Sequence, residues 1–121
     1  MKSKASKKSK QLKAIEKSIL HWQRIAFGYR EVGEGITPED CACCKLYFNN
    51  FCEDCPIFEY TGEAYCANTP YVTVENAYVD LVHVCHSYSK ALDILSIQKL
   101  ALTELRFLND VACWIKAGKP E

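Results

Sequence analysis

Apolar residues in the first part of the chain recur every three or four positions, which is the spacing of one face of an α-helix. This stripe runs from Leu12 to Tyr29, and charged residues fall largely on the other side. The Lys/Ser-rich residues before it have almost no apolar side chain to bury. The pattern therefore predicts a helix over about residues 8–30 and a flexible basic arm at residues 1–10.

A second apolar stripe occupies the C-terminal third of the chain. It fits either one long helix over residues 74–116 or two helices that break near residues 87–93. Two helices that pack on the first are the more compact arrangement, because a single long rod could not bury both halves of the stripe. We therefore predict a mainly α fold with three to four main helices and a single domain over residues 11–118.

The stretch between the two stripes holds six of the eight cysteines, all within residues 41–66. The Thr-Pro-Glu-Asp sequence at residues 37–40 is a helix-start signal, in which the aspartate can return a hydrogen bond to the threonine. It predicts a short helix over about residues 38–48. Pro56 predicts a second brief helical segment after a tight turn. The long helices would thus pack around an irregular loop module at residues 38–71.

Two CxxC pairs in this module lie seven residues apart. Two-residue gaps let each pair chelate one ion, and four thiolates at about 2.3 Å make the tetrahedral site that zinc prefers. We therefore predict a module pinned by Zn²⁺. The predicted ligands are Cys41, Cys44, Cys52 and Cys55. Cys66 is an alternative ligand that could replace one of them, and Cys43 is expected to pack as a small buried residue.

Other uses of the cysteines stay open. A reducing cytosol keeps thiols free, so the even cysteine count favours a metal over disulfides. The Cys55-Pro56 pair is typical of ferredoxins, but the compact CxxCxxC triplet of an iron–sulfur site is absent. A redox-active CxxC of the thioredoxin type would require a βαβ unit, which the sequence does not predict. Unliganded core thiols are the remaining alternative.

The histidines add little to this metal site. His21 could bind the metal or bond to a thiolate, but a half-buried histidine beside the core Trp22 is the favoured interpretation. It stays a minor candidate ligand. His83 and His86 are spaced for one helix face, with Cys85 between them. A second metal site there would require a further ligand from another segment.

The charge of the chain is strongly asymmetric. Residues 1–30 carry nine Lys/Arg and one acidic residue, while the remainder carries six Lys/Arg and 14 Asp/Glu. The basic segment could bind a phosphate backbone, or it could serve only as a solubilising tail. The acidic remainder argues against a broad nucleic-acid surface.

Signatures of catalysis and of export are missing. The sequence has no HExxH, P-loop, GxSxG or GxGxxG motif. We therefore do not expect an enzyme. The Lys/Ser-rich start lacks the apolar stretch of a signal peptide, and charges interrupt every apolar run that could span a membrane. We expect a cytoplasmic protein without membrane contact.

Five short segments follow one another in a fixed order between residues 15 and 71: IEKSILHW, CACCKLY, CEDCPI, TGEAYC and TPY. This ordered set, with an ELRFL segment at residues 104–108, resembles small cysteine-rich proteins encoded by bacteriophages and prophages. The resemblance implies that five cysteines act together, namely Cys41, Cys44, Cys52, Cys55 and Cys66. It also adds some weight to His21. The extra Cys43 and the long lysine arm depart from the pattern.

These features together predict a small zinc-binding accessory protein of the phage type, located in the cytoplasm of the host. We expect it to act as a protein-interaction or adaptor module, because it combines a metal-stiffened loop with aromatic residues and no catalytic set. The aromatic residues expected to be exposed are Tyr47, Phe48, Phe51, Tyr60 and Tyr65. Two alternatives are a nucleic-acid-binding protein that uses residues 1–30 and a Cys-dependent redox protein.

Overall fold

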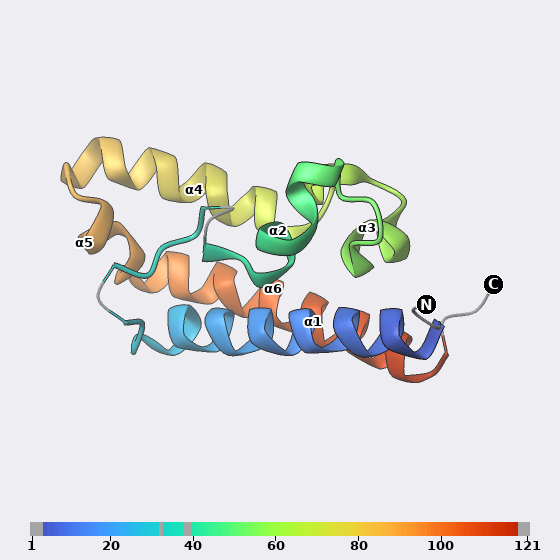
Figure 1. Cartoon of the computed structure of the whole chain (residues 1–121). Helices are drawn as coiled ribbons and strands as arrows, with labels where there is room; N and C mark the ends of the chain where they lie inside the picture. The colour runs from blue at the N-terminus through green and yellow to red at the C-terminus, as the bar shows by residue number, and fades with distance from the viewer. Residues whose placement is uncertain (1–3, 32, 38–39, 119–121) are drawn as a thin grey trace.

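The structure is a computed structural model that describes residues 4–31, 33–37 and 40–118. Within these residues the chain forms six α-helices and no strand, so the predicted mainly α fold is confirmed. The three long helices are α1 (Lys4–Phe27), α4 (Pro70–Cys85) and α6 (Leu95–Lys116). Helix α6 lies between α1 and α4 and forms the centre of the molecule (Figure 1).

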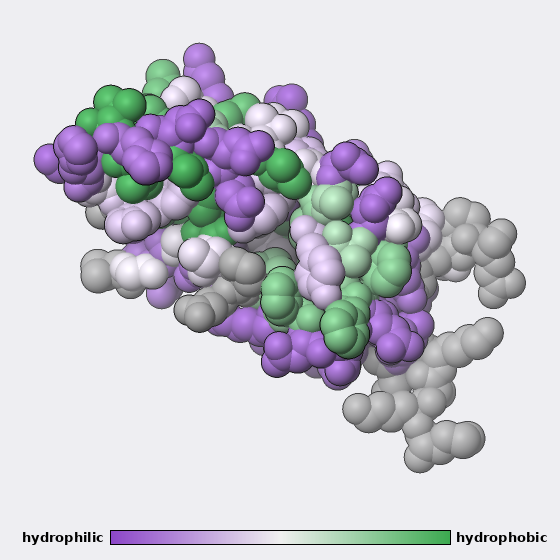
Figure 2. Space-filling view, turned by 90° about the horizontal axis from the view of Figure 1, so that it is seen from above, coloured by the Kyte–Doolittle hydropathy of each residue, from purple (hydrophilic) through white to green (hydrophobic). Residues whose placement is uncertain are grey.

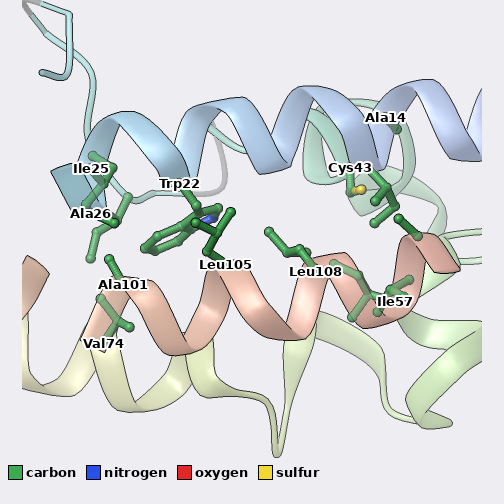
Figure 3. Close-up of a cluster of buried hydrophobic side chains, with 14 of the residues drawn as sticks. Ala14, Trp22, Ile25, Ala26, Cys43, Ile57, Val74, Ala101, Leu105 and Leu108 are labelled. Atoms are coloured by element: carbon green, nitrogen blue, oxygen red, sulfur yellow. The ribbon is translucent and has the colours of Figure 1, made fainter. Parts of the chain in front are cut away.

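Helices α1 and α6 run antiparallel and bury their apolar stripes against each other (Figures 1 and 3). Trp22 of α1 lies beside Leu105 and Leu108 of α6 in the space between the helices. All three side chains are buried, as is Ile25 one turn further along α1. Burial of each such side chain contributes about 1.5–3 kcal/mol. The two stripes read from the sequence therefore form the main helix interface.

The C-terminal third forms α4, the short helix α5 (Tyr88–Leu92) and α6, instead of one long helix. His86 ends α4 in the left-handed conformation, with a φ of 55°, and its N–H donates to the carbonyl of Val82 at 2.8 Å. Ser87 then caps α5, because its hydroxyl accepts the N–H of Lys90 at 3.1 Å. The chain turns back here, which gives the more compact of the two predicted arrangements.

Helix α1 begins earlier than the sequence predicts. Residues 4–10, expected to be part of a flexible arm, form its first turns, and residues 1–3 lie outside the described residues. The ammonium of Lys7 lies 2.9 Å from a carboxylate oxygen of Asp54 and 3.0 Å from one of Glu59. These partners lie far along the chain, so the apolar pattern alone could not reveal them.

The cysteine-rich segment contains two short α-helices, each followed by a 3-10 helix. They are α2 (Ala42–Tyr47), η2 (Phe48–Asn50), α3 (Pro56–Thr61) and η3 (Ala64–Cys66). The expected return bond is present, since Asp40 Oδ2 accepts the Thr37 N–H at 3.2 Å and its hydroxyl at 2.9 Å. However, α2 begins only at Ala42, with Cys41 as its N-cap. Residues 38 and 39, part of the predicted helix, lie outside the described residues.

The second CxxC forms the tight turn that the sequence predicts. Cys52 and Asp54 both adopt the left-handed conformation, with φ values of 63° and 64°. The N–H of Cys55 donates to the carbonyl of Cys52 at 3.0 Å. Pro56 then opens α3, and Gly62 ends it with a φ of 79°. Both proline and glycine occupy the helix ends that their backbone preferences favour.

The buried apolar residues form one continuous core. It includes side chains of the three long helices together with those of α2 and α3. The short helices of the cysteine-rich segment therefore share the core of the long ones. No helix among the residues described here combines the length and apolar character required to cross a membrane.

Candidate metal centre

The six cysteines at residues 41–66 lie where α2, α3 and η3 pack against α1 and α6. All eight cysteines of the chain are free thiols. Cys43, Cys52 and Cys55 are buried, whereas Cys41, Cys44 and Cys66 are half-buried. The hydroxyl of Ser18 in α1 donates to the sulfur of Cys43 at 3.8 Å and lies 3.9 Å from that of Cys41. Helix α1 thus provides a polar contact to the cluster.

Four of the thiols interact directly with one another. Hydrogen bonds with the side chains of Cys43 and Cys44 lower the pKa of Cys41 well below its ordinary value. A hydrogen bond with Cys43 likewise lowers the pKa of Cys55. Cys41 and Cys55 are therefore the sulfurs on which negative charge is best stabilised. Cys43 is buried in the core, as predicted, and it also bonds within the cluster (Figure 3).

Cys52 and Cys66 lie at the edge of this group. The sulfur of Cys52 accepts the backbone N–H of Tyr65 at 3.4 Å. Burial raises the pKa of Cys52 and, more strongly, that of Cys66. Tyr65 and Cys66 both adopt the left-handed conformation, each with a φ of 59°. The hydrogen bond to Cys52 thus holds the backbone one residue before Cys66 in an uncommon conformation.

A small cavity of about 40 Å³ lies among α1, α2, η3 and α6. Its lining includes three cysteines and two other groups that can bind a cation, namely Cys41, Cys44, Cys66, His21 and Glu104. Neither cysteine of the second CxxC lines it. The volume is enough for one or two water-sized particles.

Glu104 of α6 is the most unusual member of this lining. The side chain is only 3% exposed, and its Oε1 has no hydrogen-bond partner. Burial, together with the nearby Cys41 sulfur, raises the pKa of Glu104 to about 8, although the backbone N–H of Tyr71 acts in the opposite direction. A buried carboxyl group with an unpaired oxygen is costly, so a native structure that contains one calls for an explanation.

Glu104 is not among the site residues predicted from the sequence. The available signal was its position in the second apolar stripe, three residues after Ala101 and four before Leu108. A helix residue at that spacing belongs to the buried face. A glutamate placed there is informative, because charged residues are almost never fully buried unless they are paired.

His21 lies beside Trp22, as the favoured interpretation predicts, but it is buried and not half-buried. The two rings lie edge to face at 5.5 Å. Its Nδ1 lies 2.5 Å from Glu34 Oε2, and the Arg24 guanidinium also bonds this carboxylate. Burial alone would raise the pKa of Glu34, but the bonds from Arg24, the Glu31 N–H and His21 lower it to about 2.

Among the described residues, no three His, Cys, Asp or Glu side chains already converge closely enough to hold a metal ion. Their chemistry nevertheless suits a divalent ion. The thiols of Cys41, Cys43, Cys44 and Cys55 form hydrogen bonds among themselves, and Glu104 Oε1 has no hydrogen-bond partner. Once the thiols have lost their protons, these sulfurs could bind a cation, and those bonds would replace the hydrogen bonds among them.

The other two histidines, His83 and His86, lie elsewhere, near the end of α4. Both are exposed, and His86 is the residue that ends the helix.

No family model matches the chain, and no similar curated protein or solved structure was found. Function is therefore inferred from the residues and geometry of this chain alone.

Proposed function

We propose that the protein is a small zinc-binding accessory protein of the bacteriophage type that acts as a protein-interaction or adaptor module. The ligands would come from the clustered cysteines Cys41, Cys44, Cys52, Cys55 and Cys66. When bound, zinc supplies folding free energy to such modules. The thiol cluster and the unpaired Glu104 oxygen support a metal, and the resemblance to phage-encoded proteins supports the accessory role.

The observation that carries the interaction role is a group of exposed aromatic side chains on the cysteine-rich segment. We call Phe48, Phe51 and Tyr65 the aromatic edge. Phe51 is 76% exposed, and the rings of Phe48 and Tyr65 lie 5.1 Å apart. On the face formed by α2, α3 and α4, hydrophobic residues lie among hydrophilic ones (Figure 2). Exposed aromatic residues that gather in this way are typical of protein-binding surfaces.

Two of the aromatic residues predicted to be exposed do not belong to this edge. Tyr47 is buried, so its predicted exposure is wrong. It belongs to the core cluster, and the lysine ammonium of Lys10 lies 6.0 Å from its ring centroid. Tyr60 is exposed, but its ring packs edge to face on Phe107 and Trp114 of α6. The aromatic edge is therefore confined to the segments that carry Cys52 and Cys66.

The test is affinity purification from a bacterial lysate with the wild type and a Phe51→Ser/Tyr65→Ser variant. Val84→Ser is the matched control, because Val84 is 77% exposed on α4 and lies outside the edge. We expect a protein that the wild type and the control retain equally and that the double variant retains at least about tenfold less. Equal retention by all three, or no retained protein, would contradict the interaction role.

A basic groove favours nucleic-acid binding as the second candidate function. Lys10, Lys13 and Lys17 follow one another along α1 and, with Lys45 of α2, line a groove of about 740 Å³. Their helical spacing of three and four residues places them on one face, where they could contact successive phosphates. The groove also contains Glu31 and Asp40, which oppose a long phosphate track.

This second function is tested by fluorescence anisotropy with a labelled single strand and a labelled duplex at low salt. A Lys13→Glu/Lys17→Glu variant should lose binding, whereas Lys99→Glu, an exposed site on α6 outside the groove, should not. Binding should also weaken steeply as salt rises. A dissociation constant above about 100 μM for both ligands at low salt would exclude this function.

A further inference from the structure

Only one of the two CxxC pairs lines the cavity beside the cysteine cluster. Both cysteines of the first pair line it, and so does Cys66, whereas Cys52 and Cys55 do not. The remaining acidic group in the lining is Glu104, whose Oε1 is buried without a partner. Three cysteines and one carboxyl group with an unpaired oxygen therefore line one small cavity, and their side chains would have to draw closer together to hold an ion.

We propose that the metal ion is bound by Cys41, Cys44, Cys66 and Glu104, and not by the two CxxC pairs. This inference rests on the proposed zinc-binding function and specifies its ligands. Zinc accepts such a mixed set, with sulfur at about 2.3 Å and carboxylate oxygen at about 2.0–2.2 Å. Glu104 is a residue that the cysteine spacing could not indicate, because it lies on a different helix.

The carboxylate is assigned as the fourth ligand because it lacks any other partner for Oε1. The backbone N–H of Tyr71, in the first turn of α4, also stabilises the carboxylate, but Oε1 has no hydrogen-bond partner. His21 also lines the cavity, and Glu34, itself held by Arg24, binds its Nδ1. A carboxylate on one ring nitrogen leaves the other nitrogen available to a metal, so His21 Nε2 is the competing fourth ligand that the experiment must distinguish from Glu104. A divalent ion in the cavity would satisfy the unpaired oxygen and compensate the burial of the carboxylate.

The second CxxC has other contacts in the structure. The thiol of Cys55 forms a hydrogen bond with that of Cys43, and Cys55 is also the N-cap residue of α3. Cys52 accepts the N–H of Tyr65, directly before Cys66. Cys52 is therefore a positioning residue, since it holds the turn that brings Cys66 to the cavity.

This ligand set also differs from the paired CxxC site in the helices that the metal ion would connect. Cys41 and Cys44 lie at the start of α2, Cys66 ends η3, and Glu104 lies in the middle of α6. Coordination by these four residues would attach the cysteine-rich segment to the central helix. Coordination by the two CxxC pairs would join residues of that segment only.

The decisive experiment is X-ray absorption spectroscopy at the zinc edge on the full chain loaded with one equivalent of Zn²⁺. We expect three sulfur neighbours at about 2.3 Å and one oxygen at about 2.0–2.2 Å. Four sulfur neighbours, or a nitrogen with the scattering pattern of imidazole, would overturn the assignment and leave the zinc function intact. A chain that takes up no zinc would overturn the proposed zinc function itself and this assignment with it.

Variants provide a second readout, the affinity for Zn²⁺ in competition with a chelator. Glu104→Gln and Cys66→Ser should each weaken the affinity by more than about 100-fold, beyond the 10- to 100-fold typical of residues that only orient a ligand. Cys55→Ser is the matched control and should retain one tightly bound ion. Loss of the ion in Cys55→Ser with full affinity in Glu104→Gln would contradict the assignment. The absorption spectrum of the wild type distinguishes three sulfurs and one oxygen from four sulfurs even if a variant does not fold.

Discussion

The side-chain amide of Gln11 donates to the backbone carbonyl of Asp54 at 2.7 Å, across 43 residues of sequence. The same Nε2 lies 3.0 Å from Glu59 Oε1, and the Gln11 side chain is fully buried. One glutamine of α1 therefore contacts both the turn of the second CxxC and the following helix α3. Together with the ion pairs of Lys7, this contact holds the cysteine-rich segment against the N-terminal half of α1.

Replacement of Gln11 by alanine should destabilise the protein by about 1–3 kcal/mol, because it removes buried hydrogen bonds and leaves a void. The free energy of unfolding can be measured by urea titration. Gln23→Ala, a half-buried position on the same helix, is the matched control and should cost less than about 0.5 kcal/mol. Equal losses at the two positions would show that Gln11 does not anchor the turn.

The Glu34 carboxylate should make stability depend on pH in the acid range. Its pKa is lowered from 4.5 to about 2 in the folded chain, so the unfolded chain binds more protons between these two values. Stability should therefore be complete above about pH 5 and should decrease as the pH falls toward 2, by on the order of 2–3 kcal/mol.

The variant Glu34→Gln isolates this carboxylate from the others. It should lose stability at pH 7, because Arg24 and His21 lose their charged partner, and it should show a weaker decrease on acidification. Asp110→Asn, at an exposed position on α6, should keep the pH profile of the wild type. Identical profiles for the wild type and Glu34→Gln would rule out the proposed role of Glu34.

The interface between α1 and α6 should provide most of the stability. Leu108 is 1% exposed and lies between the two helices, so Leu108→Ala should cost about 2–5 kcal/mol (Figure 3). Leu95→Ala is the control on the same helix, since Leu95 is 62% exposed, and its cost should stay within about 0.5 kcal/mol. Thermal unfolding followed by circular dichroism compares the two. Similar midpoints would contradict this assignment of the core.

The long helices could be predicted because their apolar stripes are continuous and regular. Pro56 and Gly62 likewise mark both ends of α3, since each residue occupies the helix end that its backbone favours. The break after α4 was predicted only approximately, because His86 ends the helix in a left-handed conformation without a glycine or proline signal. Local preferences therefore predict most of the fold.

The features that depend on contacts between distant residues could not be predicted in the same way. Helix α1 begins at Lys4, and Lys7 bonds with Asp54 and Glu59 far along the chain. The spacing of the cysteines predicts a common cluster, but it cannot show which sulfurs face one cavity. Glu104 belongs to the cavity only because α6 packs beside the cysteine-rich segment.

Removal of metal should destabilise the chain selectively. A zinc-loaded sample treated with a strong chelator should unfold at a lower temperature, because ligand binding to the folded state adds to stability. Re-addition of Zn²⁺ should restore the midpoint, whereas Ca²⁺ should not, since calcium prefers oxygen ligands. A midpoint that does not respond to either treatment would show that the cysteine cluster folds without a metal.

The most direct test of the metal centre is native mass spectrometry of the purified chain, combined with elemental analysis. The account predicts one zinc ion per chain, held with all thiols reduced and released when the chelator is added. A chain that carries no metal, or one whose cysteines at residues 41–66 are joined by disulfides, would contradict it.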